Sequence, residues 1–178
     1  IGTGDADGIF QLESAGMRSF MMKLQPESLE DIIAGIALYR PGPMSFIPKY
    51  IEGKKNRENV TYESPLLEPI LRTTYGCIVY QEQVMQIVQE LGGYSLGRAD
   101  LVRRAMSKKK HDVMLAERQN FVYGNPEEHV AGCVSKGIAP EVADKIFDEM
   151  VAFAEYAFNK AHSTGYAVVC YWTAWLKY

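Results

Sequence analysis

The spacing of apolar residues constrains the fold of this chain more than any other feature of its sequence. Between Met17 and Leu24 the apolar residues stand at positions i, i+3, i+4 and i+7, which is the pattern of a helix that buries one face. Further helices are predicted over residues 28–39, 48–52, 81–91, 96–106, 111–122, 140–154 and 166–177, with a weaker helical segment up to residue 136. We therefore expect a mainly α protein, a multi-helix domain with at most one short extended or β element, at residues 77–80.

Capping and helix-breaking residues set the borders of several predicted helices. Ser28 precedes an acidic first turn, as an N-cap residue does. Pro41 ends that helix, because the residue before a proline avoids helical backbone angles. Gly92 and Gly93 provide the C-terminal stop of the helix over residues 81–91, and Pro140 suits the first turn of another helix.

The length and composition are those of an ordinary soluble protein. With 178 residues, 47% of them hydrophobic and 23% charged, the chain can bury one sizeable core, so we expect one domain or a large part of one. The longest apolar stretches, residues 32–39 and 166–172, fall short of the roughly 18 residues that a membrane-spanning helix needs. The chain begins at Ile1 without the layout of a signal peptide, and we expect it to be cut from a longer protein.

The three cysteines are far apart and form neither a Cys-x-x-Cys pair nor a Cys/His cluster. This use of cysteine is typical of a reduced, cytoplasmic protein without structural zinc. Asp5, Asp7 and Glu13 also lack the local pattern of a metal site. We therefore predict no metal ligand in this chain.

Positive charge is concentrated between residues 98 and 110. Six basic residues there face a single acid, Asp100, which gives a local charge of +5, whereas the whole chain carries −3 and the remainder therefore −8. The six are Arg98, Arg103, Arg104, Lys108, Lys109 and Lys110. Adjacent guanidinium groups can hold a polyphosphate through paired hydrogen bonds, and lysines suit a nucleic-acid backbone. A solvated helix end, in which the lysines complement the helix dipole, explains the run equally well.

At residues 158–163, a dense group of polar residues is expected to form a non-helical segment between two apolar helices. Its polar residues are Asn159, Lys160, His162 and Ser163. A loop with only a structural role does not require so many, so a site is favoured. The alternative is that Asn159 and Ser163 cap the last helix. Glu82, at the start of another helix, is explained by its favourable interaction with the helix dipole.

Taken together, these segments resemble the bacterial replicative DNA polymerases of the C family, the DNA polymerase III alpha subunits. The resemblance runs in order along nearly the whole chain. The main stretches that carry it are Gly8-Ile9-Phe10-Gln11-Leu12-Glu13-Ser14, Ala37-Leu38-Tyr39-Arg40-Pro41-Gly42-Pro43, Val79-Tyr80-Gln81-Glu82-Gln83, Arg103-Arg104-Ala105-Met106, Lys108-Lys109-Lys110 and Phe158-Asn159-Lys160 with His162. In that family this region is the fingers, which follow the palm and close over the incoming nucleotide. The resemblance therefore implies that residues 1–8 are a loop or the tail of the palm and that residues 9–178 belong to the fingers domain.

The resemblance also implies roles for individual residues. Arg103 and Arg104 are expected to face the triphosphate of the incoming deoxynucleotide. Asn159, Lys160 and His162 are expected to line the same nucleotide pocket, with the imidazole ring excluding ribonucleotides by its bulk. The DNA-binding residues are expected to be Arg98, Lys108, Lys109 and Lys110. Two positions depart from the family pattern, Ser107, where glycine is common, and Ala161, where serine is common.

Catalytic residues are not expected in this chain. Polymerisation needs metal ions held by carboxylates, and in this family the aspartates that hold Mg²⁺ belong to the palm. The resemblance implies an enzyme that acts on template-primer DNA and deoxynucleoside triphosphates, and that meets the sliding clamp and other replisome subunits through other regions. The chain alone is therefore expected to be inactive.

Two other classes of function remain open from the residues themselves. A helical module could bind nucleic-acid phosphates through residues 98–110 and have no role in catalysis. A structural or protein-interaction domain would use the apolar final helix as a docking surface. Nucleotide selectivity distinguishes the polymerase from the first, and binding that is insensitive to salt would favour the second.

Overall fold

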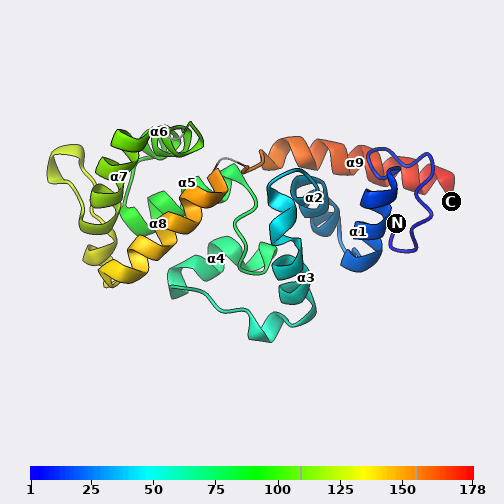
Figure 1. Ribbon diagram of the computed structural model, residues 1–178, viewed down its shortest axis with the longest axis horizontal. Coiled ribbons are helices and arrows are strands. Elements are labelled where there is room, and N and C mark those ends of the chain that lie inside the picture. Colours follow the sequence, from blue (N-terminus) through cyan, green and yellow to red (C-terminus); the bar gives the residue numbers. More distant parts are fainter. Residues whose placement is uncertain (109, 155) are drawn as a thin grey trace.

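The protein is built from helices in two groups that lie end to end (Figure 1). The computed structural model describes residues 1–108, 110–154 and 156–178. In this described part the α-helices are α1 (Ala15–Leu24), α2 (Leu29–Leu38), α3 (Ile47–Lys55), α4 (Glu68–Leu71), α5 (Gln81–Gly92), α6 (Leu96–Ser107), α7 (His111–Tyr123), α8 (Pro140–Ala154) and α9 (Lys160–Lys177). Short 3-10 turns lie at Pro43–Phe46, Arg57–Asn59, Pro65–Leu67, Arg72–Thr74, Pro126–Glu128 and Cys133–Lys136. The prediction of a mainly α fold is confirmed.

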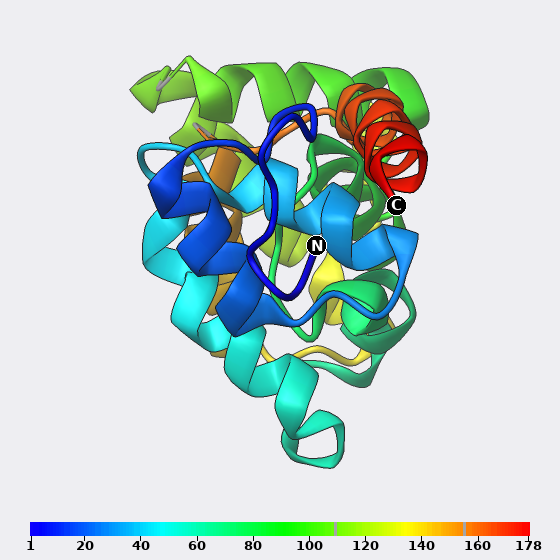
Figure 2. The ribbon, with the colours of Figure 1, turned by 90° about the vertical axis from the view of Figure 1, so that its right-hand side faces the viewer.

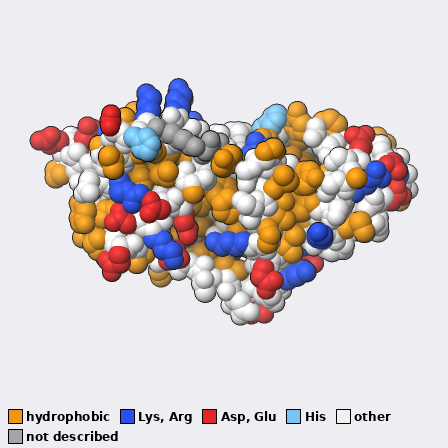
Figure 3. All heavy atoms as spheres, in the orientation of Figure 1, with side chains coloured by type: hydrophobic (Ala, Val, Ile, Leu, Met, Phe, Trp, Pro, Cys, Tyr) orange, Lys and Arg blue, Asp and Glu red, His pale blue; other side chains and the backbone are white. Residues whose placement is uncertain are grey.

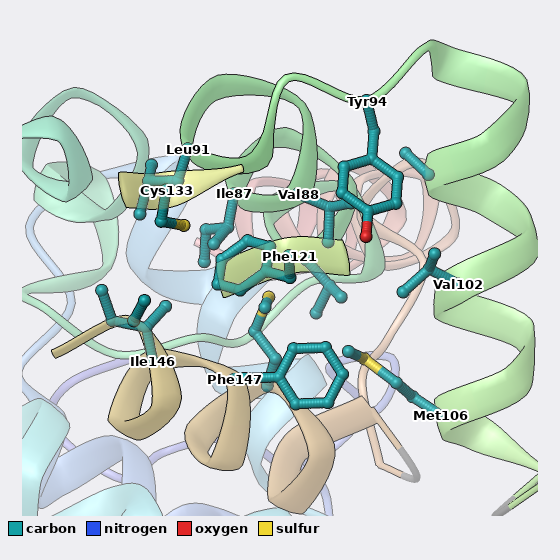
Figure 4. Close-up of a cluster of buried hydrophobic side chains, with 14 of the residues drawn as sticks. Ile87, Val88, Leu91, Tyr94, Val102, Met106, Phe121, Cys133, Ile146 and Phe147 are labelled. Carbon is teal, nitrogen blue, oxygen red and sulfur yellow. The ribbon is translucent and has the colours of Figure 1, made fainter. Parts of the chain in front are cut away.

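The first helical group contains α5, α6, α7 and α8. Its core is a cluster of buried side chains drawn from all four helices (Figure 4). Members include Ile87, Val88, Leu91, Val102, Met106, Phe121, Ile146 and Phe147. Phe121 on α7 and Phe147 on α8 are nearly inaccessible to solvent, and their ring centroids lie 5.7 Å apart. This core supports α6, which carries most of the basic segment.

The second helical group contains α1, α2 and α3, with α9 packed along α2. Figure 2 shows α9 lying beside this group, with the N-terminal segment passing close to the C-terminal end. Asp5 holds the two ends together by accepting hydrogen bonds from Lys177 and Tyr178. The hydrogen bond from Lys177 is the main reason why the pKa of Asp5 is lowered, and the hydrogen bond from Tyr178 adds to the effect. Phe46 packs against the cores of both groups.

Local signals predicted most helix borders well. Ser28 forms a capping box with Asp31 at the start of α2, and Gly93 ends α5 in the left-handed conformation at φ +75°. The helix predicted over residues 48–52 is longer, and forms α3 directly after a 3-10 turn. The weaker helical segment predicted up to residue 136 consists of two 3-10 turns.

Two borders differ from the sequence pattern. The final helix begins at Lys160, so the predicted start at residue 166 is wrong. The reason is that Asn159 acts as the N-cap, and the polar residues after it form the first turn of the helix. Of residues 77–80, Tyr80 has an extended backbone and forms an isolated parallel bridge with Phe158. A single bridge leaves these residues outside any sheet, in agreement with the short extended element that was expected.

None of the helices in the described part of the chain has the length and apolar character that crossing a bilayer requires.

The three cysteine thiols are buried and free. Burial raises the pKa of Cys77 and of Cys170 to about 11 and that of Cys133 to about 12. Because the thiolate is the reactive form, we expect alkylation at pH 8 to be at least about a hundredfold slower than for a free thiol. Mass spectrometry after timed exposure to iodoacetamide measures this rate, and the same exposure in urea should modify all three. Rapid labelling of the folded protein would contradict the burial.

Candidate functional site

The basic segment lies mainly on α6, along one long edge of the molecule. Ser95 caps this helix, since its hydroxyl accepts a hydrogen bond from the backbone N–H of Arg98. Ala99, Val102 and Met106 are buried against the core, so the basic residues project from the other faces of α6. Figure 3 shows Lys and Arg side chains standing out from the edge of the molecule that α6 forms.

Arg103 and Arg104 bind the same carboxylate. Arg103 donates to Oδ1 of Asp100 from Nε at 3.0 Å and from Nη2 at 2.8 Å, and Nε of Arg104 lies 2.7 Å from Oδ2. The hydrogen bond from Arg103 is the main reason why the pKa of Asp100 is lowered. The side chain of Arg104 is 62% exposed, against 16% for Arg103. One carboxylate therefore orients two guanidinium groups and leaves a net positive charge at this place.

Arg98 has a different environment. Its Nη2 lies 2.7 Å from Glu117, its Nη1 pairs with Glu128, and its guanidinium lies 5.6 Å from the centre of the Tyr94 ring. The two carboxylates compensate its charge, and the side chain is only 19% exposed. Arg98 thus ties α6 to α7 and to the 3-10 turn Pro126–Glu128, while its contact with DNA stays a prediction.

The lysines follow at the C-terminal end of α6. Lys108 and Lys110 are exposed, and the backbone N–H of Lys110 donates to the carbonyl of Ala105. Lys109 lies outside the described residues. The two described lysines therefore offer accessible positive charge next to the arginine pair.

The predicted polar site at residues 158–163 is the N-terminus of α9. The side-chain oxygen of Asn159 accepts a hydrogen bond from the backbone N–H of His162 at 2.9 Å, which confirms the capping alternative for Asn159. Its side-chain amide donates to Glu82 at 3.1 Å. The backbone N–H of Lys160 also donates to Glu82, and its ammonium group lies 2.9 Å from Glu30. Two carboxylates therefore surround the start of α9.

His162 lines an open cavity of about 410 Å³. Its imidazole ring lies between two aromatic rings, with centroid distances of 5.4 Å to Phe158 and 4.4 Å to Tyr166. The other lining residues are Phe10, Gln11, Glu13, Ser14, Met17, Ile36, Tyr39 and Arg40. Of the three residues predicted to share a nucleotide pocket, His162 thus lines this cavity, whereas Asn159 and Lys160 bind Glu82 and Glu30.

Arg40 is a further member of this cavity that the sequence pattern did not single out. Its guanidinium carbon lies 4.1 Å from the centre of the Phe158 ring, and its Nη2 donates to the carbonyl of Tyr156 at 2.7 Å. Burial lowers the pKa of Arg40. In the sequence, the local pattern around Arg40 indicates only a rigid turn at Pro41. The one signal that could have marked Arg40 as a site residue is its position as a cation directly before that turn.

The two groups of predicted residues lie along one edge of the molecule. Both α6 and α9 follow this edge in Figure 1, and Figure 2 again shows both at the top. Among the described residues, no hydrogen bond or ion pair joins Arg103 or Arg104 to the start of α9. The arrangement thus offers cations at one place and an aromatic cavity with an imidazole at another.

No cluster of three or more His, Cys, Asp or Glu side chains in the described parts of the chain could hold a metal ion. The groups that this edge of the molecule presents are of another kind. Its chemistry is that of cations, hydrogen-bond donors and aromatic rings.

Comparison with known proteins identifies the region. A family model described as the bacterial DNA polymerase III alpha subunit finger domain matches residues 1–129. The chain belongs to this family. The match includes the whole basic segment, whereas the start of α9 lies beyond the matched part of this finger domain.

Curated relatives cover the finger domain almost completely. DNA polymerase III subunit alpha of Halalkalibacterium halodurans is 49% identical over 174 residues, which are 98% of this chain and 15% of the relative. The proteins of the same name from Chlamydia trachomatis and Bacillus subtilis are 49% and 48% identical over 98% of this chain, which covers 13% and 15% of their lengths. The chain thus spans about 13–15% of the length of these curated relatives.

Proposed function

We propose that this finger domain binds the incoming deoxynucleoside triphosphate and positions template-primer DNA in a replicative DNA polymerase. The observation that carries the proposal is the arginine pair on α6, where Asp100 orients Arg103 and Arg104 at an exposed edge. Guanidinium groups form paired hydrogen bonds with phosphate oxygens. Cations held in position stabilise the charge that develops on the phosphates during transfer.

The other residues have separate parts in the proposal. Lys108 and Lys110, with Lys109, contact the DNA backbone, where each cation neutralises phosphate charge. Arg98 belongs to the same DNA-binding surface in the proposal, where it adds hydrogen-bond donors more than net charge because Glu117 and Glu128 compensate its guanidinium. His162 faces the nucleotide sugar from the aromatic cavity and leaves no room for a 2′-hydroxyl. Asn159 and Lys160 are nucleotide-binding residues of the same region in the proposal.

In the proposed enzyme, the metal-dependent chemistry belongs to other parts of the polymerase. Mg²⁺ would be held by carboxylates in another part of the polymerase chain, and the finger domain alone would be inactive. The sliding clamp and other replisome subunits would bind elsewhere, and the enzyme would act in the cytoplasm.

The test uses the complete polymerase chain that carries this finger domain. Single-nucleotide incorporation on a primer-template gives kcat and KM for the matched deoxynucleotide. Arg103→Ala and Arg104→Ala should each raise KM about tenfold or more, because a hydrogen bond to a charged group contributes about 1.5–3 kcal/mol. Arg57→Ala is the control, since this exposed arginine pairs with Glu27 and should leave KM unchanged.

The opposite result would identify a different function. If both arginine variants keep the KM of the parent protein but weaken DNA binding in a salt-dependent way, the segment is a general nucleic-acid surface. The finger domain would then hold DNA without recognising the nucleotide.

A further inference from the structure

Glu82 is the residue that joins the two helical groups at the start of α9. It lies in the first turn of α5, and its carboxylate also accepts hydrogen bonds at the N-terminus of α9. Both carboxylate oxygens lie 3.1 Å from the backbone N–H of Lys160, and Oε1 lies 3.1 Å from the side-chain amide of Asn159. One negative charge thus faces the positive ends of two helices.

The neighbours of Glu82 hold the same segment of backbone. The backbone N–H of Gln81 donates to the carbonyl of Phe158 at 2.9 Å, and its side-chain amide donates to the carbonyl of Ala157 at 3.1 Å. The N–H of Phe158 donates in turn to the carbonyl of Val79 at 3.2 Å. Residues 79–82 therefore dock the segment that leads into α9, and Glu82 fixes the helix start itself.

A short chain of contacts connects Glu82 with His162. Asn159 donates to Glu82 through its amide nitrogen, and its oxygen accepts the N–H of His162. Because Glu82 fixes which way the Asn159 amide points, it also fixes the capping bond. The ring of His162 then lies in place between Phe158 and Tyr166, at the wall of the cavity.

We infer that Glu82 is a positioning residue for nucleotide selection: through Asn159 it sets the place of His162 in the cavity that receives the nucleotide sugar. The inference rests on the sugar role proposed for His162. Glu82 does not touch the nucleotide, and its effect passes through the start of α9. A change at Glu82 should therefore alter the choice between deoxynucleotide and ribonucleotide, and not only the overall rate.

The experiment measures kcat/KM for a matched deoxynucleotide and for its ribonucleotide in the complete polymerase chain, and takes their ratio. Glu82→Ala should lower this ratio about tenfold, since a displacement of about 1 Å in a positioned group can cost up to about 10²-fold. Glu82→Gln keeps an oxygen that can accept one hydrogen bond, and should lower the ratio less. Glu90→Gln is the matched control, because it removes an exposed carboxylate from the other end of the same helix.

His162→Ala and the double variant Glu82→Ala/His162→Ala complete the design. If Glu82 acts through His162, His162→Ala lowers the ratio and the second change lowers it no further. If Glu82→Ala lowers kcat/KM for the deoxynucleotide and for the ribonucleotide by the same factor, the ratio is unchanged. Glu82 then has only a structural role, and the inference is overturned. If His162→Ala itself leaves the ratio unchanged, the sugar role of His162 is wrong, and the inference fails with it.

Discussion

Replacement of Asp31 by alanine should lower the free energy of unfolding by about 3–5 kcal/mol, the usual cost of removing one partner from a buried ion pair. The side chain of Asp31 is 3% exposed, and its Oδ2 lies 3.5 Å from Nζ of Lys54, which is 6% exposed. The same oxygen accepts the backbone N–H of Glu27 and of Ser28. Alanine would leave these donors without their acceptor and would leave the charge of Lys54 without its buried partner.

Lys54 would keep some compensation after this change. Its ammonium group donates to the carbonyls of Leu24 and Gln25 at the C-terminal end of α1, where a cation interacts well with the helix dipole. Asp31→Asn retains an oxygen for the two backbone N–H groups, so it should cost less than Asp31→Ala.

Urea unfolding followed by far-UV circular dichroism measures these differences. Asp7→Ala is the control, because Asp7 is 77% exposed and pairs with Arg18 at the surface, where the loss should stay below about 1 kcal/mol. Equal midpoints for Asp31→Ala and Asp7→Ala would show that the buried pair does not stabilise the fold.

Phe147→Ala should also cost about 3–5 kcal/mol, because it removes a large buried side chain and leaves a cavity. Phe147 is 1% exposed, packs against Phe121, and lies with its ring 5.1 Å from the guanidinium carbon of Arg118. Figure 4 shows it between α8 and the side chains of Val102 and Met106 on α6. The loss should therefore loosen the helix that carries Arg103 and Arg104.

Tyr123→Ala on α7 is the matched control, since this aromatic side chain is 58% exposed and its removal should change stability by no more than about 0.5 kcal/mol. Phe147→Leu keeps most of the buried volume and should fall between the two. The measurement is again the urea midpoint. An unchanged midpoint for Phe147→Ala would mean that α6 and α8 are held together by other contacts.

Most helix borders were predictable because their signals act over a few residues. Ser28, Pro41 and Gly93 each set the backbone of their nearest neighbours, through a side-chain cap, a fixed angle or a left-handed turn. The start of α9 was missed although its signal is equally local. Asn159 is a candidate cap in the sequence, but the polar residues after it indicate a break between two apolar helices, whereas in the structure they form the first turn of α9.

The candidate site was predictable in composition and not in geometry. The arginine pair and His162 stand out in the sequence as charge and as a polar block. Their distribution over two separate places on one edge depends on how the two helical groups pack. The importance of Arg40 and Glu82 likewise follows from partners more than seventy residues away in the chain.

The sequence by itself determined that this chain is helical and where most of its helices begin and end. Through its match to the finger domain family, the sequence also determined which part of a polymerase the chain resembles. Caps, breakers and apolar spacing determine these features, since each acts within about one helical turn. The tertiary structure alone decided that Glu117 and Glu128 neutralise Arg98, whereas Asp100 pairs with Arg103 and Arg104 within one turn of α6. It also brought Glu82 to the start of α9, because only the packing of the helices brings together residues that are distant in sequence.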